Sequence, residues 1–168
     1  MFQKDEYVFY ESGGICRISD IQVSPLDGMP ADRSYYVMNS LHERNGVIYI
    51  PVDNDKVFLR RLMDAAQAQK LIDRIPTVEV IDEPNAKLLR AKYLDAMKTH
   101  DPIEWVRVIK TVYHRTTGQE RRVQRLSETE RSFSESAKRF LYTEISLALG
   151  IREDEVEDYI TDRLGQLA

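Results

Sequence analysis

Several kinds of residue are scarce in this chain of 168 residues, and each scarcity excludes a class of protein. The single cysteine, Cys16, cannot form a disulfide within the chain, so a reducing cytoplasm is the expected compartment. No apolar run approaches the roughly 20 residues that a membrane-spanning helix needs. The three histidines, His42, His100 and His114, do not have the spacing of zinc ligands. We therefore expect no membrane partner and no metal site.

The sequence motifs of catalysis are also missing. Residues 12–14, "SGG", are too short to form a glycine-rich phosphate loop. Residues 133–136, "FSES", lack the glycines of a nucleophile elbow. The composition, with 42% hydrophobic and 31% charged residues, is that of an ordinary folded protein. We expect no enzymatic activity, no cofactor and no small-molecule substrate.

Charge is distributed unevenly along the chain. The net charge of −4 by itself disfavours a nucleic-acid partner. Residues 87–139, however, contain thirteen lysines and arginines and seven acidic residues, so that 13 − 7 gives +6. A basic segment of this kind predicts either a solvated helical surface with many salt bridges or a surface that binds a polyanion. The charge count leaves both readings open.

The first sixty residues predict short β-strands. Runs of apolar, β-branched and aromatic residues alternate with turn residues in "EYVFY", "ICRISDIQV", "SYYVMNSL" and "GVIYIPV". Strands this short and closely spaced are typical of a small, strongly bent β-barrel of the SH3 or Tudor type. Pro51, at the end of the last run, suits an edge strand, where a missing amide donor is tolerated.

From about Arg60 the apolar residues follow a helical period. The predicted fold class is therefore α+β, with an N-terminal Tudor-like β-barrel followed by an all-α helical bundle. We expect the barrel domain over residues 1–72, a connector over residues 73–84 and the helical domain over residues 85–168. The only tryptophan, Trp105, shares a helical stripe with Ile109 and Val112 and is expected in the core.

Three helix ends carry clear local signals. Asp101 followed by Pro102 predicts the start of a helix that runs to about residue 115. Ser127, with Glu130 three residues later, forms the capping box of a long helix, and Gly150 is placed to end it. Residues 153–164 then predict a short acidic helix.

The order of these features resembles the CarD/CdnL family of bacterial transcription regulators. The resemblance rests on "VFYESGGICRISDI" and "YYVM...GVIYIPV" in the first half and on "LSETERSFSESAKRFLYTEISLALG" in the second, and it covers nearly the whole chain. It implies that the Tudor-like domain binds the β subunit of RNA polymerase. It also implies that the helical domain contacts promoter DNA at the upstream edge of the transcription bubble, that the open complex is stabilised, and that polymerase holds the protein near the nucleoid.

The resemblance assigns polymerase binding to an edge strand formed by Val47, Ile48, Tyr49 and Ile50. A strand edge pairs with a partner strand through its own backbone groups, so the identity of its side chains is less restricted. Strand alternation places Ile48 and Ile50 in the barrel core and Tyr49 on the opposite face. Some members of the family have arginine where this chain has Tyr49, so a salt bridge there is not implied.

The resemblance also assigns residues to the DNA-facing side. It places Ala86, after Asn85, where well-studied branches have a tryptophan wedge, and an alanine offers little surface to prop open a base step. The expected phosphate contacts are Lys87, Arg90, Arg121, Arg122, Arg125 and Arg131. For the three arginines at 121–125, a solvated loop is the equally acceptable reading.

The main alternative is a protein–protein interaction module in which both halves bind proteins and DNA has no role. Ala86 favours this alternative because it removes the wedge. Charge reversal at Lys87, Arg90 and Arg131 discriminates between the two hypotheses, since only DNA binding depends on these cations.

Overall fold

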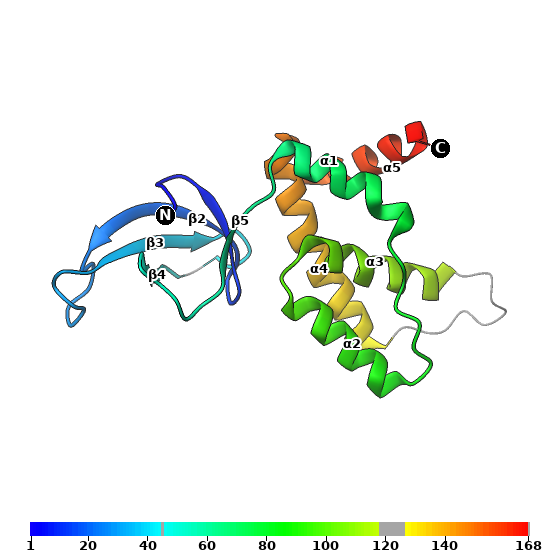
Figure 1. Ribbon diagram of the computed structural model, residues 1–168, viewed down its shortest axis with the longest axis horizontal. Helices are drawn as coiled ribbons and strands as arrows, with labels where there is room; N and C mark the ends of the chain where they lie inside the picture. Colours follow the sequence, from blue (N-terminus) through cyan, green and yellow to red (C-terminus); the bar gives the residue numbers. More distant parts are fainter. Residues whose placement is uncertain (45, 118–126, 168) are drawn as a thin grey trace. The chain divides into compact units, whose positions relative to one another are not determined.

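A computed structural model describes residues 1–44, 46–117 and 127–167 (Figure 1). The chain divides into two compact units, Met1–Leu62 and Met63–Ala168. The first unit is built of β-strands and the second of helices, which confirms the predicted α+β class. No helix in the described ranges combines the length and the apolar character required to cross a membrane.

The first unit is a curled antiparallel sheet of five strands. In chain order these are β1 (Tyr7–Tyr10), β2 (Gly14–Val23), β3 (Ser34–Ser40), β4 (Ile48–Pro51) and β5 (Leu59–Arg61). Their order across the sheet is β4-β3-β2-β1-β5, so that β4 and β5 form its two edges. A register shift between Ile18 and Asp20 marks a bulge in β2, and bulges bend and twist a strand. The four predicted strands are confirmed, and the sheet is a half-barrel.

Strand β5 was not predicted from the sequence, which placed Arg60 and Arg61 at the start of a helix. Arg60 pairs with Phe9, and Arg61 pairs with Val8 of β1. The guanidinium of Arg60 lies 5.0 Å from the centre of the Phe9 ring, and that of Arg61 lies 5.5 Å from the centre of the Phe2 ring. Cation–π contacts of this kind let an arginine occupy a strand position while covering apolar surface.

One face of the sheet carries a core cluster of buried side chains. It comprises Val8, Cys16, Ile18, Tyr36, Met38 and Ile50. Gly13 lies close beside this core, because an added Cβ atom would lie 3.0 Å from Ile48 Cδ1 and 3.0 Å from Tyr10 Cδ1 and would make these side chains shift. The turn between β1 and β2 is therefore packed directly against β4.

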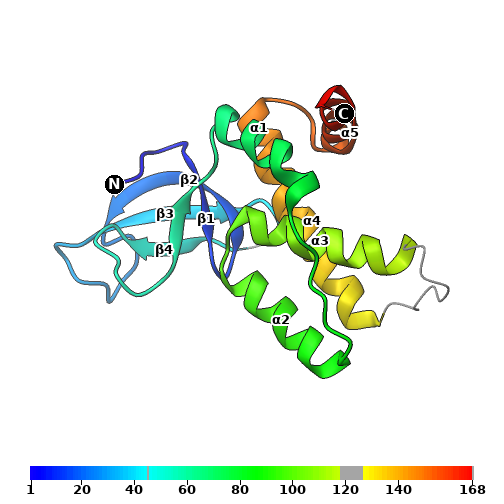
Figure 2. The same ribbon diagram turned by 45° about the vertical axis from the view of Figure 1, so that its right-hand side comes forward.

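The second unit is a helical bundle around one long helix (Figures 1 and 2). Its α-helices are α1 (Ala65–Arg74), α2 (Ala86–Lys98), α3 (Pro102–Thr117), α4 (Glu128–Leu149) and α5 (Val156–Leu167). Two 3₁₀ turns, η1 (Ile75–Thr77) and η2 (Glu153–Glu155), follow α1 and precede α5. Helix α4 packs against all four others. Trp105 is fully buried, with its ring 5.5 Å from that of Phe140, which confirms its predicted place in the core.

The predicted helix ends are confirmed. The Asp101 carboxylate accepts a hydrogen bond of 3.0 Å from the backbone N–H of Ile103. Ser127 and Glu130 form the reciprocal capping box of α4. Gly150 ends α4 with a φ of 65°, in the left-handed region that favours glycine. These ends depend on neighbours within a few residues, and local sequence therefore determines them.

Helix α1 belongs to the helical unit, whereas the sequence placed residues up to 72 with the barrel. Its side chains Ala68, Leu71 and Ile72 are buried, and α1 packs against α4 and α5. Asp73 accepts two hydrogen bonds, of 2.6 and 2.9 Å, from Arg163 of α5. A boundary after residue 72 would fall inside α1, so the observed division lies before this helix.

The expected connector is partly fixed to the bundle. The ammonium group of Lys110 on α3 donates hydrogen bonds to the carbonyl oxygens of Ile75, Pro76 and Val78, at 2.9, 2.9 and 2.7 Å. The backbone N–H of Ile81 donates to the Thr111 hydroxyl at 2.9 Å. These contacts hold the chain between α1 and α2 against α3.

Candidate functional site

The outer side of β4 is an unpaired sheet edge within the part of the chain that the structure describes. The backbone N–H of Val52 donates to the Ser34 carbonyl at 2.9 Å. Since bonded and non-bonded pairs alternate in an antiparallel ladder, Ile50 and Ile48 bond to β3. The backbone groups of Tyr49 and Pro51, and by continuation those of Val47, point away from the sheet. The edge thus offers amide donors at Val47 and Tyr49 and none at Pro51.

The side chains of β4 alternate as the sequence predicted. Ile50 is 4% exposed within the core cluster, and Ile48 packs against that cluster. Tyr49 lies on the opposite face, across from Val37 of β3, and is half-buried. Val47, just before the strand, is 49% exposed. The strand is therefore anchored through the Ile48 and Ile50 face, while its outer backbone edge is unpaired among the described residues.

The start of α2 carries four of the residues assigned to DNA. Asn85 is the helix N-cap, and its side chain accepts a hydrogen bond of 3.0 Å from Leu88 N–H. Ala86, Lys87 and Arg90 are exposed. The structure thus gives Asn85 a structural role and leaves the other three at the surface.

An exposed leucine lies two residues beyond Ala86. The buried stripe of α2 is Leu89, Tyr93 and Ala96, whereas Leu88 is 53% exposed. Leu88 and Leu89 lie 100° apart around the helix, so only Leu89 shares the buried stripe with Tyr93 and Ala96.

Arg131 lies near the start of α4. It is exposed and lines a groove of about 710 Å³ between α3, α4 and α5. Helices α2 and α4 begin at the same end of the bundle, as both ribbon views show (Figures 1 and 2). The structure brings these two helix starts together, while Lys87 and Arg90 lie on the outer surface of α2 and Arg131 lies on the rim of the groove.

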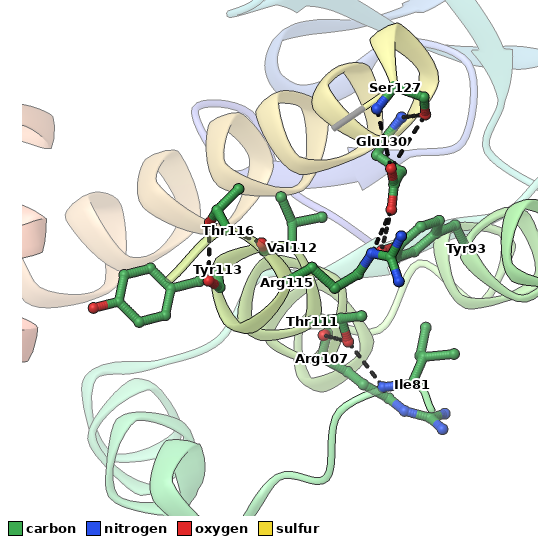
Figure 3. A network of polar contacts seen from close by, with 10 residues as sticks. All are labelled: Ile81, Tyr93, Arg107, Thr111, Val112, Tyr113, Arg115, Thr116, Ser127 and Glu130. Carbon is green, nitrogen blue, oxygen red and sulfur yellow. Dashed lines mark hydrogen bonds and ion pairs between the residues drawn. The ribbon is translucent and has the colours of Figure 1, made fainter. Parts of the chain in front are cut away.

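A buried carboxylate at the start of α4 connects the middle of α2 with the last turn of α3 (Figure 3). The Glu130 carboxylate accepts hydrogen bonds from Ser127 N–H at 3.1 Å, from the Ser127 hydroxyl at 3.3 Å and from the Tyr93 hydroxyl at 3.4 Å. It also forms an ion pair with Arg115, with 2.8 Å between Nε and the carboxylate oxygen. Burial raises the pKa of Tyr93, so its hydroxyl stays neutral and able to donate. The sequence identified Glu130 only as a capping residue, because the partners on α2 and α3 are distant along the chain.

The structure separates the basic residues of this segment into two groups. Several serve the fold, namely Lys92 paired with Glu83, Arg107 with Glu104, Arg115 with Glu130, Lys110 on three carbonyl oxygens and Arg139 over the Phe140 ring. Lys87, Arg90 and Arg131, like Lys98 and Lys138, have no side-chain ion pair or hydrogen bond with any residue that the structure describes. The salt-bridged surface therefore accounts for part of the charge, and these three cations remain available to a ligand.

Arg121, Arg122 and Arg125, also assigned to DNA, lie outside the described residues. Within the described ranges, no three histidine, cysteine, aspartate or glutamate side chains are grouped so as to hold a metal ion.

Fold and site together define a binding protein with an open sheet edge in one unit and a partly basic helical surface in the other. The family described as CarD-like/TRCF RID domain matches residues 2–63, and the family described as CarD, C-terminal domain matches residues 70–161. This chain belongs to the CarD family, whose members are non-enzymatic transcription factors that interact with RNA polymerase. No curated protein matches the chain closely enough to count as a relative.

Proposed function

We propose that this protein binds the β subunit of RNA polymerase through the β4 edge and promoter DNA through its helical unit, and that it stabilises the open complex. The observation that carries the proposal is the unpaired edge at Val47 and Tyr49, held in place by the buried side chain of Ile50. An edge with free donors and acceptors accepts an added strand from a partner. Binding to polymerase then concentrates the protein at the nucleoid.

The DNA part of the proposal rests on Lys87, Arg90 and Arg131. These cations are exposed and have no ion-pair partner among the described residues. They lie near the starts of α2 and α4, where the helix dipoles and the backbone N–H groups that the caps leave free favour anions. Contacts of this kind neutralise phosphates without reading base sequence.

The weakness of such contacts explains why the two units work together. With Ala86 at the wedge position, base-step insertion does not contribute, so free DNA is bound weakly. Attachment to polymerase raises the effective concentration of the helical unit at the promoter. The protein then favours the open complex only by the difference between its DNA affinity in the open and closed complexes.

The polymerase contact is tested with Tyr49→Pro. This substitution removes an outward-facing N–H while leaving the hydrogen bonds between β4 and β3 intact, because Ile48 and Ile50 make those bonds. We expect Tyr49→Pro to lose host RNA polymerase in a pull-down and Tyr49→Phe to retain it. Retention by Tyr49→Pro, in protein whose Cys16 remains protected from thiol reagents, would refute docking by strand addition.

The DNA contact is tested by reversing the three cations to glutamate, with Lys98→Glu as the matched control. Lys98 is exposed at the other end of α2. We expect the reversal to weaken binding of the protein to the polymerase–promoter complex. The slope of log K against log salt concentration should become shallower by about 0.9 for each phosphate that is no longer neutralised. Lys98→Glu should leave both quantities unchanged.

The second candidate is an interaction module whose helical unit binds a protein. The groove between α3, α4 and α5 favours it, since Val106, Ile109, Ile160 and Leu164 give the groove apolar walls. This candidate predicts that the triple reversal leaves promoter binding and its salt slope unchanged while polymerase binding persists.

A further inference from the structure

The groove of the helical unit is not explained by the proposed polymerase and DNA contacts. It lies between α3, α4 and α5, and its volume of about 710 Å³ falls within the roughly 300–1,000 Å³ of pockets that hold small molecules. Aliphatic side chains from all three helices line it, namely Val106, Ile109, Val112, Leu141, Ile160 and Leu164. A lining of this kind favours an apolar ligand.

The groove is long and narrow. Each turn of α4 from Arg131 to Tyr142 contributes a side chain to its lining, so it extends over roughly 16.5 Å at about 1.5 Å per residue. A volume of about 710 Å³ over that length gives a mean cross-section of roughly 43 Å². A helix with its side chains is about 10 Å across, which is a cross-section of roughly 80 Å². A helix can therefore lie over this groove but cannot enter it, whereas a single extended chain can.

Several polar groups in the lining serve the helices themselves. The Thr116 hydroxyl donates to the Val112 carbonyl at 3.0 Å, and the Thr161 hydroxyl donates to the Glu157 carbonyl at 3.0 Å. The backbone groups of the three helices bond within each helix. An extended peptide in the groove would therefore find few partners for its own N–H and C=O groups, and leaving such groups unpaired is costly. A hydrocarbon chain has no groups of this kind.

Two cations lie along the α4 side of the groove. Arg131 and Lys138 are exposed, line the groove and have no ion-pair partner among the described residues. They are seven residues apart, about two helical turns, so they lie on the same side of α4. The other charged residues of the lining are Glu135, Glu157 and Lys110, so that 3 − 2 gives +1. The lining therefore favours an anion.

The cationic and apolar parts of the groove lie toward different ends. The last turn of α3 lies beside the start of α4, because Arg115 pairs with Glu130. Tyr113, which points away from Arg115 in Figure 3, and Arg131 therefore lie at this end.

The opposite end is the more apolar one. The start of α3 lies beside the second half of α4, because the Trp105 ring is 5.5 Å from the Phe140 ring. Burial and the nearby charge of Glu157 raise the pKa of Tyr142, so α5 also lies beside this half of α4. A carboxylate placed here would be repelled by Glu157, so an anionic group belongs near Arg131 and Lys138.

We propose that this groove binds a single-chain anionic amphiphile, an unbranched hydrocarbon chain with a carboxylate head. The head pairs with Arg131 and Lys138, and the chain lies along Val106, Leu141 and Ile160 toward the α5 end. The inference does not depend on polymerase docking. Because Arg131 also belongs to the proposed DNA contact, the test of the head group uses Lys138.

The chain offers a matched control for each part of the groove. Lys138→Glu reverses a cation in the groove, and Lys98→Glu reverses an equally unpartnered cation at the end of α2, outside the groove. Ile160→Phe adds volume inside the groove, and Leu94→Phe adds volume at an exposed position of α2. Urea unfolding followed by Trp105 fluorescence reports whether the helical unit of each variant is folded.

The experiment measures binding of octanoate and decanoate, below their micelle concentrations, to the full-length protein by isothermal titration calorimetry. Decanoate should bind at least about tenfold more tightly than octanoate, because each added CH₂ group that is buried contributes a factor of about four. Decyltrimethylammonium, with the same chain length and the opposite charge, should bind about tenfold more weakly than decanoate.

The variants should separate the two parts of the site. We expect Lys138→Glu to weaken decanoate binding about fivefold, through loss of an exposed ion pair and added repulsion. Ile160→Phe should weaken it about tenfold, because the added ring occupies the space of the hydrocarbon chain. Lys98→Glu and Leu94→Phe should stay within about twofold of wild type.

Three results overturn the inference. Equal affinity for decanoate and decyltrimethylammonium would refute the cationic head site. Unchanged decanoate affinity in Lys138→Glu or in Ile160→Phe would show that the amphiphile binds elsewhere. No detectable binding of decanoate would refute the ligand and leave the groove to a protein that covers it. None of these measurements includes polymerase or DNA, so their failure is distinguishable from failure of the proposed function.

Discussion

Replacing Glu130 with alanine should destabilise the helical unit by about 3 kcal/mol, because this single carboxylate serves three helices. It caps α4 through Ser127, pairs with Arg115 of α3 and accepts a hydrogen bond from Tyr93 of α2 (Figure 3). Glu130 is 8% exposed, so water replaces little of what the substitution removes.

The magnitude follows from the three interactions taken in turn. Loss of the capping box costs about 1 kcal/mol. The Arg115 side chain is 26% exposed and regains some hydration, so its unpaired charge costs about 1 kcal/mol, less than the 3–5 kcal/mol of a fully buried pair. The hydroxyl of Tyr93, a residue with no exposed surface, loses its acceptor at about 1 kcal/mol.

The assay is equilibrium urea unfolding followed by tryptophan fluorescence. Trp105 is the only tryptophan and lies fully buried in the helical unit, so its emission reports that unit and not the sheet. The matched control is Glu135→Ala, an exposed glutamate of the same helix, which should change the free energy of unfolding by less than about 0.5 kcal/mol. A Glu130→Ala value no larger than that of the control would refute the role assigned to this carboxylate.

Three further predictions concern other parts of the molecule. The hydrogen bonds from Arg163 hold the pKa of Asp73 below its usual range. The ion pair therefore stabilises the protein fully above about pH 4, and this stabilisation is lost as the pH falls through the pKa of Asp73 in the folded protein. Asp73→Asn should lower the free energy of unfolding in urea at pH 7 and should have no such effect in strong acid. Burial raises the pKa of Cys16 to about 11, so native protein at pH 8 should react with a thiol reagent about a hundredfold more slowly than a free cysteine. Gly13→Ala should displace Ile48 and lower both sheet stability and polymerase affinity, measured by thiol protection and interferometry.

Each of these predictions has an outcome that contradicts it. An Asp73→Asn effect of equal size at pH 7 and in strong acid would show that the amide perturbs packing and not the ion pair. Native labelling of Cys16 at the rate of the urea-unfolded chain would show that the sheet does not shield it. Wild-type polymerase affinity of Gly13→Ala would show that the turn moves without disturbing β4.

Much of the fold was predictable because its determinants are local. The capping box of Ser127 and Glu130, the stop at Gly150 and the burial of Trp105 follow from patterns within one or two helical turns. The alternation of Ile48 and Tyr49 likewise follows from the geometry of one strand. The edge position suggested by Pro51 was also readable from the chain.

Only the tertiary structure determined which residues distant in sequence contact one another. Arg60 and Arg61 read as the beginning of a helix, yet pairing with β1 and contacts with aromatic rings make them a strand. Helix α1 joined the bundle and not the sheet, because its apolar face packs against α4 and α5.

The candidate site divides in the same way. Sequence alone identified the basic residues and the β4 strand, since composition and alternation are properties of the chain. It could not say that Arg115 is paired with Glu130, whereas Lys87, Arg90 and Arg131 have no such partner among the described residues. The availability of a charge or an apolar side chain depends on neighbours brought close by folding, and only the tertiary structure determines those neighbours.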